Sequence, residues 1–219
     1  MRAQLDIACL YQHAVVVSEA PVTLVDAQLF PEELAYVASA VPKRRAEFGT
    51  ARVCARQALA QFGVVAGPLV PATDRAPVWP PGFVGSISHA DDWCAVVVCP
   101  TTQARGIGLD LERDDSAAAE LEALICTAGE REWLAEQELS SRRHLRTLLF
   151  SAKEAAYKCQ YPLTRQILGF LDLEVQVDLE AEQFSVRAVA QDSRLVELTQ
   201  RMAGRMLWRD GLVFTAASL

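Results

Sequence analysis

The spacing of apolar residues along the chain predicts several helices. Between residues 43 and 62 the apolar positions recur every three or four residues, as on the buried face of a helix, and Gly63 follows as its expected end. Residues 127–139 begin with the T-x-x-E pattern of a capping box, which predicts a second helix there. A third helix is expected over 141–160, ended by Pro162.

Strands are predicted where short apolar or alternating runs lie between turn residues. These runs cover residues 14–17, 83–88, 93–98, 105–112, 170–177, 184–190 and 205–217, with an Asp210-Gly211 hairpin turn inside the last of them. The order is strand, helix, strands and then strand, helices, strands. It predicts an α/β (α+β) fold with two similar halves, residues 1–107 and 108–219.

Composition and charge narrow the class of protein. The chain has 219 residues, of which 51% are hydrophobic, and a net charge of −7, which argues against a protein that coats nucleic acid or an acidic membrane. No apolar run is long enough to span a bilayer, and the N-terminus makes a poor signal peptide. Six cysteines without a C-x-x-C pair indicate reduced thiols. Together these features predict a cytoplasmic protein.

The first candidate for chemistry is the sequence GLDLE, residues 108–112. Because side chains alternate along a strand, Asp110 and Glu112 point to the same face, roughly 7 Å apart. Two carboxylates in that arrangement can bind one hard cation such as Mg²⁺. The alternative, which the pattern alone favours, is a strand with one solvated face.

The second candidate is FSAKEAAYK, residues 150–158, on the third predicted helix. Lys153, Glu154 and Lys158 lie within two helical turns among small and apolar neighbours, a setting typical of charges in a cleft. The alternative is a simple ion pair between Glu154 and Lys158, which have the i, i+4 spacing.

Basic residues and one histidine form the third candidate group. Arg44, Arg45, Arg52 and Arg56 lie on the helix predicted over 43–62, with only one acid to balance them, and arginine is suited to phosphate recognition. The sequence GSISH, residues 85–89, places His89 at a strand end among small hydroxyl residues. A solvated helix face and a structural histidine are the alternatives. The familiar nucleotide motifs, such as the P-loop and G-x-G-x-x-G, are missing.

The order and spacing of these motifs are more specific than any one of them. GSISH, then GLDLE, then FSAKEAAYK resembles the 4′-phosphopantetheinyl transferase superfamily, in particular the surfactin-synthetase-activating (Sfp-type) class and its enterobactin-type branch. The segments KRRAEFGTARVCAR and DRAPVWP fit that branch, and the resemblance covers roughly residues 43 to 170. It implies a pseudo-dimer of two α/β halves, with the active site in the cleft between them.

The resemblance also implies an activity. The enzyme would move the phosphopantetheine arm of coenzyme A to a serine of an acyl or peptidyl carrier protein and release 3′,5′-ADP. The proposed partners are therefore coenzyme A and an apo carrier protein, for a chain that acts as a monomer. Mg²⁺, with Mn²⁺ as an alternative, is the implied metal.

Roles for individual residues follow from the same resemblance. The metal ligands would be Asp110, Glu112 and Glu154. Glu154 would also be the general base, and Lys158, aided by Lys153, would neutralise the pyrophosphate. Contacts to the phosphates and nucleotide of coenzyme A would come from Arg44, Arg52, Arg75, Gly85, Ser86, Ser88 and His89. Phe150 stands where many members have tryptophan.

Two other classes of function stay open at this point. Another Mg²⁺-dependent nucleotide phosphotransferase or hydrolase would share the acidic and basic motifs, and a non-catalytic homologue would bind the carrier or coenzyme A without transfer. The three intact carboxylates weigh against the non-catalytic alternative.

Overall fold

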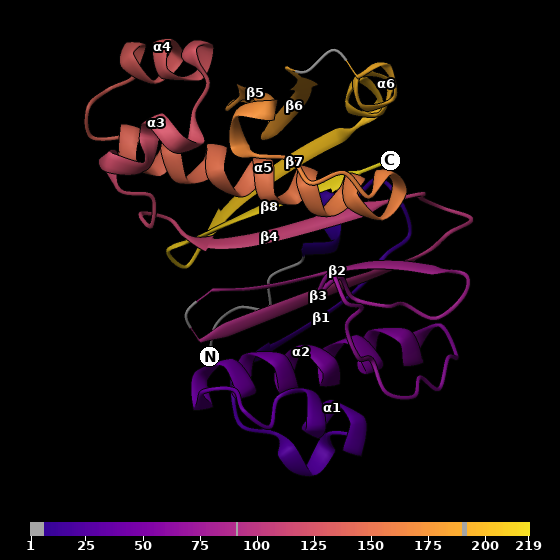
Figure 1. The fold of residues 1–219 in the computed structure, drawn as a ribbon. Helices are drawn as coiled ribbons and strands as arrows, with labels where there is room; N and C mark the ends of the chain where they lie inside the picture. Colours follow the sequence, from indigo (N-terminus) through magenta and orange to yellow (C-terminus); the bar gives the residue numbers. More distant parts are fainter. Residues whose placement is uncertain (1–6, 91, 190–191) are drawn as a thin grey trace. The chain divides into compact units, whose positions relative to one another are not determined.

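The computed structural model describes residues 7–90, 92–189 and 192–219, and the chain forms two compact units (Figure 1). One unit is His13–Ala104. The other is Arg105–Leu219 together with the described residues before His13. The predicted boundary at residue 107 differs by three residues from the observed one. Residues 7–12 belong with the C-terminal unit, where the Tyr11 hydroxyl donates a hydrogen bond to the Gly108 carbonyl at 2.8 Å.

The unit His13–Ala104 is a small sheet with a long helix on one face. Its antiparallel strands lie in the order β1 (Val16–Pro21), β3 (Trp93–Pro100) and β2 (Phe83–Ala90). Helix α2 (Pro42–Gln61) packs its small side chains against Cys94, Val96 and Val98 of β3. The short helices η2 (Asp26–Gln28) and α1 (Pro31–Tyr36) precede α2.

The C-terminal unit is a larger antiparallel sheet on which helix α5 (Arg142–Thr164) lies (Figure 1). The strand order is β4 (Ile107–Arg113), β8 (Leu212–Ser218), β7 (Ala203–Arg209), β6 (Gln183–Ala188) and β5 (Leu173–Asp178). Its other helices are η1 (Ile7–Leu10), η3 (Ala119–Leu121), α3 (Glu122–Ile125), α4 (Ala128–Glu136), η4 (Phe170–Asp172) and α6 (Ser193–Arg201). Leu148, Leu149, Ala152 and Ala155 of α5 are completely buried in the core beneath it.

A glycine on β4 allows α5 to approach the sheet closely. A Cβ atom at Gly108 would collide with the Ala155 carbonyl of α5, so only glycine fits there. This close approach brings the helical turn that carries Glu154 and Lys158 next to Asp110, two residues further along β4.

The structure confirms most predicted elements and corrects some. The 43–62 helix, the capping box of α4 and the hairpin turn at Asp210-Gly211, where both residues have positive φ, are confirmed. Pro162 does not end α5, because it lies in the last turn, where it removes only one hydrogen bond. The first strand begins at residue 16 rather than 14. Residue 91 of the predicted turn and residue 190 of a predicted strand lie outside the described residues.

Within the described residues, no helix has both the length and the apolar character that a bilayer crossing requires.

Candidate active site

Strand β4 and helix α5 bring two of the predicted site residues, Asp110 and Lys158, into contact. Asp110 on β4 is only 3% exposed, and the Lys158 ammonium group on α5 donates to its Oδ1 at 2.7 Å. Lys158 also donates to the Leu109 carbonyl at 3.1 Å. The structure therefore pairs Lys158 with a carboxylate of the neighbouring strand, a contact that helical spacing alone does not reveal.

The charges of Asp110 and Lys158 affect the pKa values of two further carboxylates, Glu112 and Glu154. Burial, followed by repulsion from Asp110, raises the pKa of Glu112 to about 7, although its hydrogen bond from Ser116 opposes the shift. Burial also raises the pKa of Glu154, with Lys158 opposing and Asp110 reinforcing that change. A bound cation would relieve the repulsion that Asp110 exerts on Glu112 and Glu154.

The carboxylate oxygens of this site are the type of ligand that a hard cation such as Mg²⁺ prefers. Asp110 and Glu112 share one face of β4, as the alternation predicts, and Mg²⁺ commonly takes one or two carboxylates together with phosphate oxygens and water. In the described part of the chain, no three Asp, Glu, His or Cys side chains are grouped so that they could together hold a metal ion. The structure therefore fits Mg²⁺ binding by the two carboxylates of β4, Asp110 and Glu112. Glu154 as a third ligand stays a prediction.

The raised pKa of Glu112 predicts a pH-dependent stability of the metal-free protein. A raised pKa gives a stabilising contribution that is complete below the ordinary value of 4.5 and lost as the pH rises through about 7. Between pH 5 and 8 the parent should therefore lose more thermal stability than Glu112→Gln, and Mg²⁺ should reduce the difference. Thermal unfolding with EDTA and with Mg²⁺ measures this. Parallel pH profiles of parent and variant would contradict the assignment.

A pocket of about 240 Å³ opens beside Glu154. One side is formed by α5 and the other by the segment that leads into β5. Its lining residues are Lys153, Glu154, Tyr157, Leu168, Gly169, Phe170 and Leu173. The Glu154 carboxylate and Tyr157 lie on one side of this small pocket, opposite the apolar side chains of Leu168, Phe170 and Leu173. The lining residues after position 160 carry no charged motif, so they were not predicted to belong to a site.

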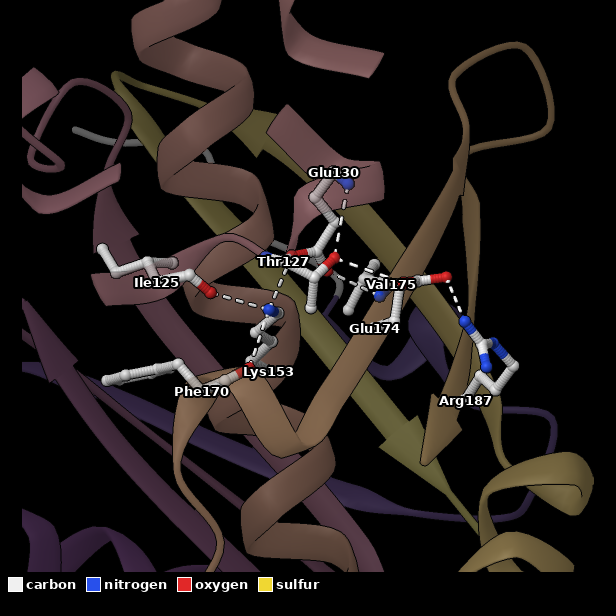
Figure 2. A network of polar contacts seen from close by, with 8 residues as sticks. All are labelled: Ile125, Thr127, Glu130, Lys153, Phe170, Glu174, Val175 and Arg187. Atoms are coloured by element: carbon white, nitrogen blue, oxygen red, sulfur yellow. Dashed lines mark hydrogen bonds and ion pairs between the residues drawn. The ribbon is translucent and has the colours of Figure 1, made fainter. Parts of the chain in front are cut away.

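Lys153, which was predicted to help neutralise the pyrophosphate, is instead buried among protein groups. It is 1% exposed, and its ammonium group donates to the Ile125 carbonyl, Glu130 Oε2 and the Phe170 carbonyl at 2.7, 2.7 and 2.8 Å (Figure 2). Because an ammonium group has three protons, this arrangement uses all of them. The geometry therefore does not support a direct contact between Lys153 and pyrophosphate.

In the N-terminal unit, the structure brings Arg44 and His89 together. Arg44 Nη1 lies 3.2 Å from His89 Nε2, and the Arg44 side chain is 54% exposed. Glu47 lies beside both of them, 3.5 Å from Arg44 and 3.7 Å from His89. An exposed arginine and an imidazole can bind a phosphate together, and Glu47, the acid that balances the helix in the sequence, orients both groups.

Arg52 is more buried than a simple surface cation. It is 6% exposed, its guanidinium carbon lies 4.0 Å from the centre of the Phe48 ring, and its Nε donates to the Leu69 carbonyl at 2.7 Å. Burial lowers the pKa of Arg52 to about 10, so the group stays charged at neutral pH. Arg52 thus combines a structural hydrogen bond with a positive charge.

The other predicted nucleotide contacts divide between the faces of β2. Ser86 and Ser88 are buried on the face opposite α2, whereas Gly85 and His89 lie on the α2 face. A Cβ at Gly85 would collide with the ring of Trp79. The side chains of the two serines and of His89 therefore do not line one surface. Arg75 is exposed in a loop, with a positive φ of 67°.

Comparison with known proteins shows the family to which the chain belongs. The model of the 4′-phosphopantetheinyl transferase N-terminal domain matches residues 32–99, and that of the 4′-phosphopantetheinyl transferase superfamily matches residues 106–201. The 4′-phosphopantetheinyl transferase Svp of Streptomyces mobaraensis is 42% identical, over 87% of this chain and 78% of its own. PptT of Mycobacterium tuberculosis is 35% identical, over 86% and 85%. Enterobactin synthase component D of Escherichia coli O157:H7 is 34% identical, over 72% and 78%.

The chain belongs to the 4′-phosphopantetheinyl transferase superfamily, and it is an enzyme of the Sfp and enterobactin type. Its activity is the transfer of phosphopantetheine to carrier proteins. The predicted family and the transfer of phosphopantetheine to carrier proteins are thereby confirmed, and the mixed helices and sheets described above confirm the predicted α/β class.

Proposed function

We propose that this enzyme takes the phosphopantetheine arm from coenzyme A, requires Mg²⁺, and releases 3′,5′-ADP. The observation that carries the proposal is the group of Asp110, Glu112, Glu154 and Lys158 beside the pocket of α5. The oxygen of the carrier serine forms a bond to the β-phosphorus of coenzyme A. The bond from that phosphorus to the bridging oxygen breaks, and the electron pair leaves with 3′,5′-ADP.

Each acidic side chain has a distinct part in this proposal. Asp110 and Glu112 hold Mg²⁺, which when bound supplies positive charge to the pyrophosphate oxygens. Glu154 accepts the proton of the serine hydroxyl, and the burial that raises its pKa increases its affinity for that proton. Lys158, already held against Asp110, adds a second positive charge for the pyrophosphate.

The pocket beside Glu154 is suited to the pantetheine arm. The arm is a narrow chain of amides and methyl groups, and the pocket presents Tyr157 with the apolar side chains of Leu168, Phe170 and Leu173. An arm held there would place the phosphate end near Glu154, which lines the same pocket. Positioning of this kind supplies much of the rate in phosphoryl transfer.

We assign the 3′-phosphate at the nucleotide end of coenzyme A to basic side chains of the unit His13–Ala104. Arg44 and His89 form the exposed pair that we assign to the 3′-phosphate, with the positive charge of Arg52 in support. Arg75, Gly85, Ser86 and Ser88 stay predictions for the rest of the nucleotide, as do the cytoplasmic location and the monomeric state.

Mass spectrometry of carrier modification tests the proposal. Purified enzyme with coenzyme A, Mg²⁺ and apo carrier proteins of fatty-acid, polyketide and peptide pathways should add one phosphopantetheine to a carrier serine and release 3′,5′-ADP. Reactions with EDTA or without carrier should release none. Release of 3′,5′-ADP without a carrier would instead indicate a hydrolase. Binding of coenzyme A without any transfer would indicate a non-catalytic homologue.

Arg44→Ala should weaken recognition of the 3′-phosphate. Loss of a charge-assisted contact costs roughly 1.5–3 kcal/mol, or about 10- to 100-fold in kcat/KM for coenzyme A. With dephospho-coenzyme A as donor the loss should be much smaller, and the exposed position of Arg44 should leave thermal stability unchanged. Steady-state kinetics with both donors measures the effect.

Arg52→Ala is the matched comparison for Arg44→Ala, because it also removes the buried hydrogen bond to Leu69 and should lower stability. Equal losses with the two donors in Arg44→Ala would exclude the assigned phosphate contact.

A further inference from the structure

A buried ion pair connects α5 to the segment that forms the second wall of the pocket. Lys153 and Glu130 side chains are each 1% exposed, and their charged groups lie 2.7 Å apart. The remaining two protons of Lys153 go to the carbonyls of Ile125 and Phe170 (Figure 2). Lys153 therefore holds two main-chain segments against α5, and one of them, at Phe170, lines the pocket.

Glu130 extends the same network to β5. Its Oε2 accepts from the Thr127 amide at 2.7 Å as well as from Lys153, and its Oε1 accepts from the Val175 amide at 2.7 Å. Figure 2 shows these contacts converging from α4, α5 and β5. The pocket wall from Leu168 to Leu173 is thus held in its middle by the Phe170 carbonyl and just beyond its end by the Val175 amide.

The network ends at the surface. Thr127 Oγ1 donates to Glu174 at 3.3 Å, and Glu174 accepts from Arg187 on β6 at 2.7 Å. The Arg187 side chain is 62% exposed, so the buried part of the network is the Glu130–Lys153 pair. Both charges are compensated by hydrogen bonds with fixed geometry, which favours one arrangement of the surrounding main chain.

We propose that Glu130 and Lys153 are positioning residues that set the width of the pocket and thereby the binding of the pantetheine arm beside Glu154. Lys153 adjoins Glu154 in the sequence, and its ammonium group holds the Phe170 carbonyl of the opposite wall. A shift of that wall would change the space for the arm without touching the groups that bind phosphate. The inference rests on the proposed function of the pocket.

Three variants and a control separate positioning from simple stabilisation. Lys153→Met removes all three hydrogen bonds, and Glu130→Gln keeps the size of the side chain but removes its charge. The double variant removes both charges, so it should recover part of the stability that each single variant loses. Arg146→Met is the control. Arg146 lies on α5, is 6% exposed, and binds Glu122 at 2.9 Å and the Ala117 carbonyl at 3.1 Å, with no place in the pocket lining.

Calorimetric binding of coenzyme A and of 3′,5′-ADP, each with Mg²⁺, gives the decisive comparison, because 3′,5′-ADP lacks the pantetheine arm. In Lys153→Met and in the double variant, the Kd for coenzyme A should rise about 10- to 100-fold, and the Kd for 3′,5′-ADP should stay unchanged. Because Lys153 also lines the pocket and Glu130 does not, Glu130→Gln should show the same selective rise in the Kd for coenzyme A. Arg146→Met should lose a similar amount of thermal stability and bind both ligands as the parent does.

Several outcomes would overturn this inference. One is equal weakening of both ligands in the variants at Glu130 and Lys153. Another is normal binding of coenzyme A by the double variant, which remains informative if Lys153→Met alone does not fold. A third is weakened binding of coenzyme A in Arg146→Met as well. If the parent protein itself does not bind coenzyme A, the proposed function fails instead, and the pocket loses its assigned ligand.

Discussion

Asp110→Asn should lower kcat/KM for carrier modification by about 10²–10³-fold, since it removes a negative charge that holds the proposed Mg²⁺. Asparagine keeps the size of the side chain and an oxygen that can accept from Lys158, which now binds Oδ1 at 2.7 Å. It is a better test than alanine because Asp110 is buried rather than exposed in a cleft. Steady-state transfer measured over a range of Mg²⁺ concentrations should show that the variant needs a higher Mg²⁺ concentration than the parent for half-maximal activity.

The same substitution should leave the fold intact. It removes the repulsion that helps to raise the pKa of Glu112, so this pKa should fall toward its ordinary value of 4.5. Asp115→Asn is a suitable control, because Asp115 carries the same charge near the end of β4 but pairs with Arg143 at the surface. Near-normal turnover of Asp110→Asn at low Mg²⁺ would refute the metal assignment, as would an equal loss in the control.

The long elements of the fold were predictable because their patterns are local. Helix α2 shows regular apolar spacing, and the turn at Asp210-Gly211 has residues that tolerate positive φ. Helix α6 was missed, although it is as long as α4, because it lies between strands and lacks the T-x-x-E start that marks α4. A signal was available, since Asp192 caps the helix by accepting from the Leu195 amide, and Leu195 and Leu198 form its buried side.

The contacts within the site depend on distant residues, and the sequence could predict them only in part. Motif order pointed to Asp110, Glu112, Glu154 and Lys158 as site residues. The ion pair between Asp110 and Lys158 was not predicted, because it joins a strand to a helix. The order of the motifs could not reveal that Lys153 is buried against Glu130, because these residues lie 23 positions apart on different helices. Glu130 itself appeared only as part of a capping box, a local role that concealed its tertiary one.

Glu154→Gln should lower the rate of single-turnover transfer by about 10²–10⁴-fold if Glu154 is the general base. Glutamine keeps the size of the side chain and one acceptor oxygen but cannot take the serine proton. Coenzyme A binding with Mg²⁺ should then stay close to that of the parent. If Glu154 is mainly a metal ligand, calorimetry should show weaker coenzyme A binding together with the lower rate.

The thermal stability of Glu154→Gln and the pH dependence of its transfer rate distinguish these catalytic roles of Glu154 from a purely structural one. Burial and Asp110 raise the pKa of Glu154, so the carboxylate stabilises the fold less as the pH rises through that pKa. Glu154→Gln should therefore be at least as stable as the parent at pH 7. Transfer by the parent should increase with pH through the same range, because the base must be deprotonated. The variant should lose the part of this dependence that Glu154 contributes and keep the part that comes from Glu112. A simple ion pair with Lys158 would contribute only about 0.2–0.5 kcal/mol. A variant that transfers at the parent rate would leave Glu154 with that minor role alone, because neither a base nor an essential ligand can be replaced by an amide without loss.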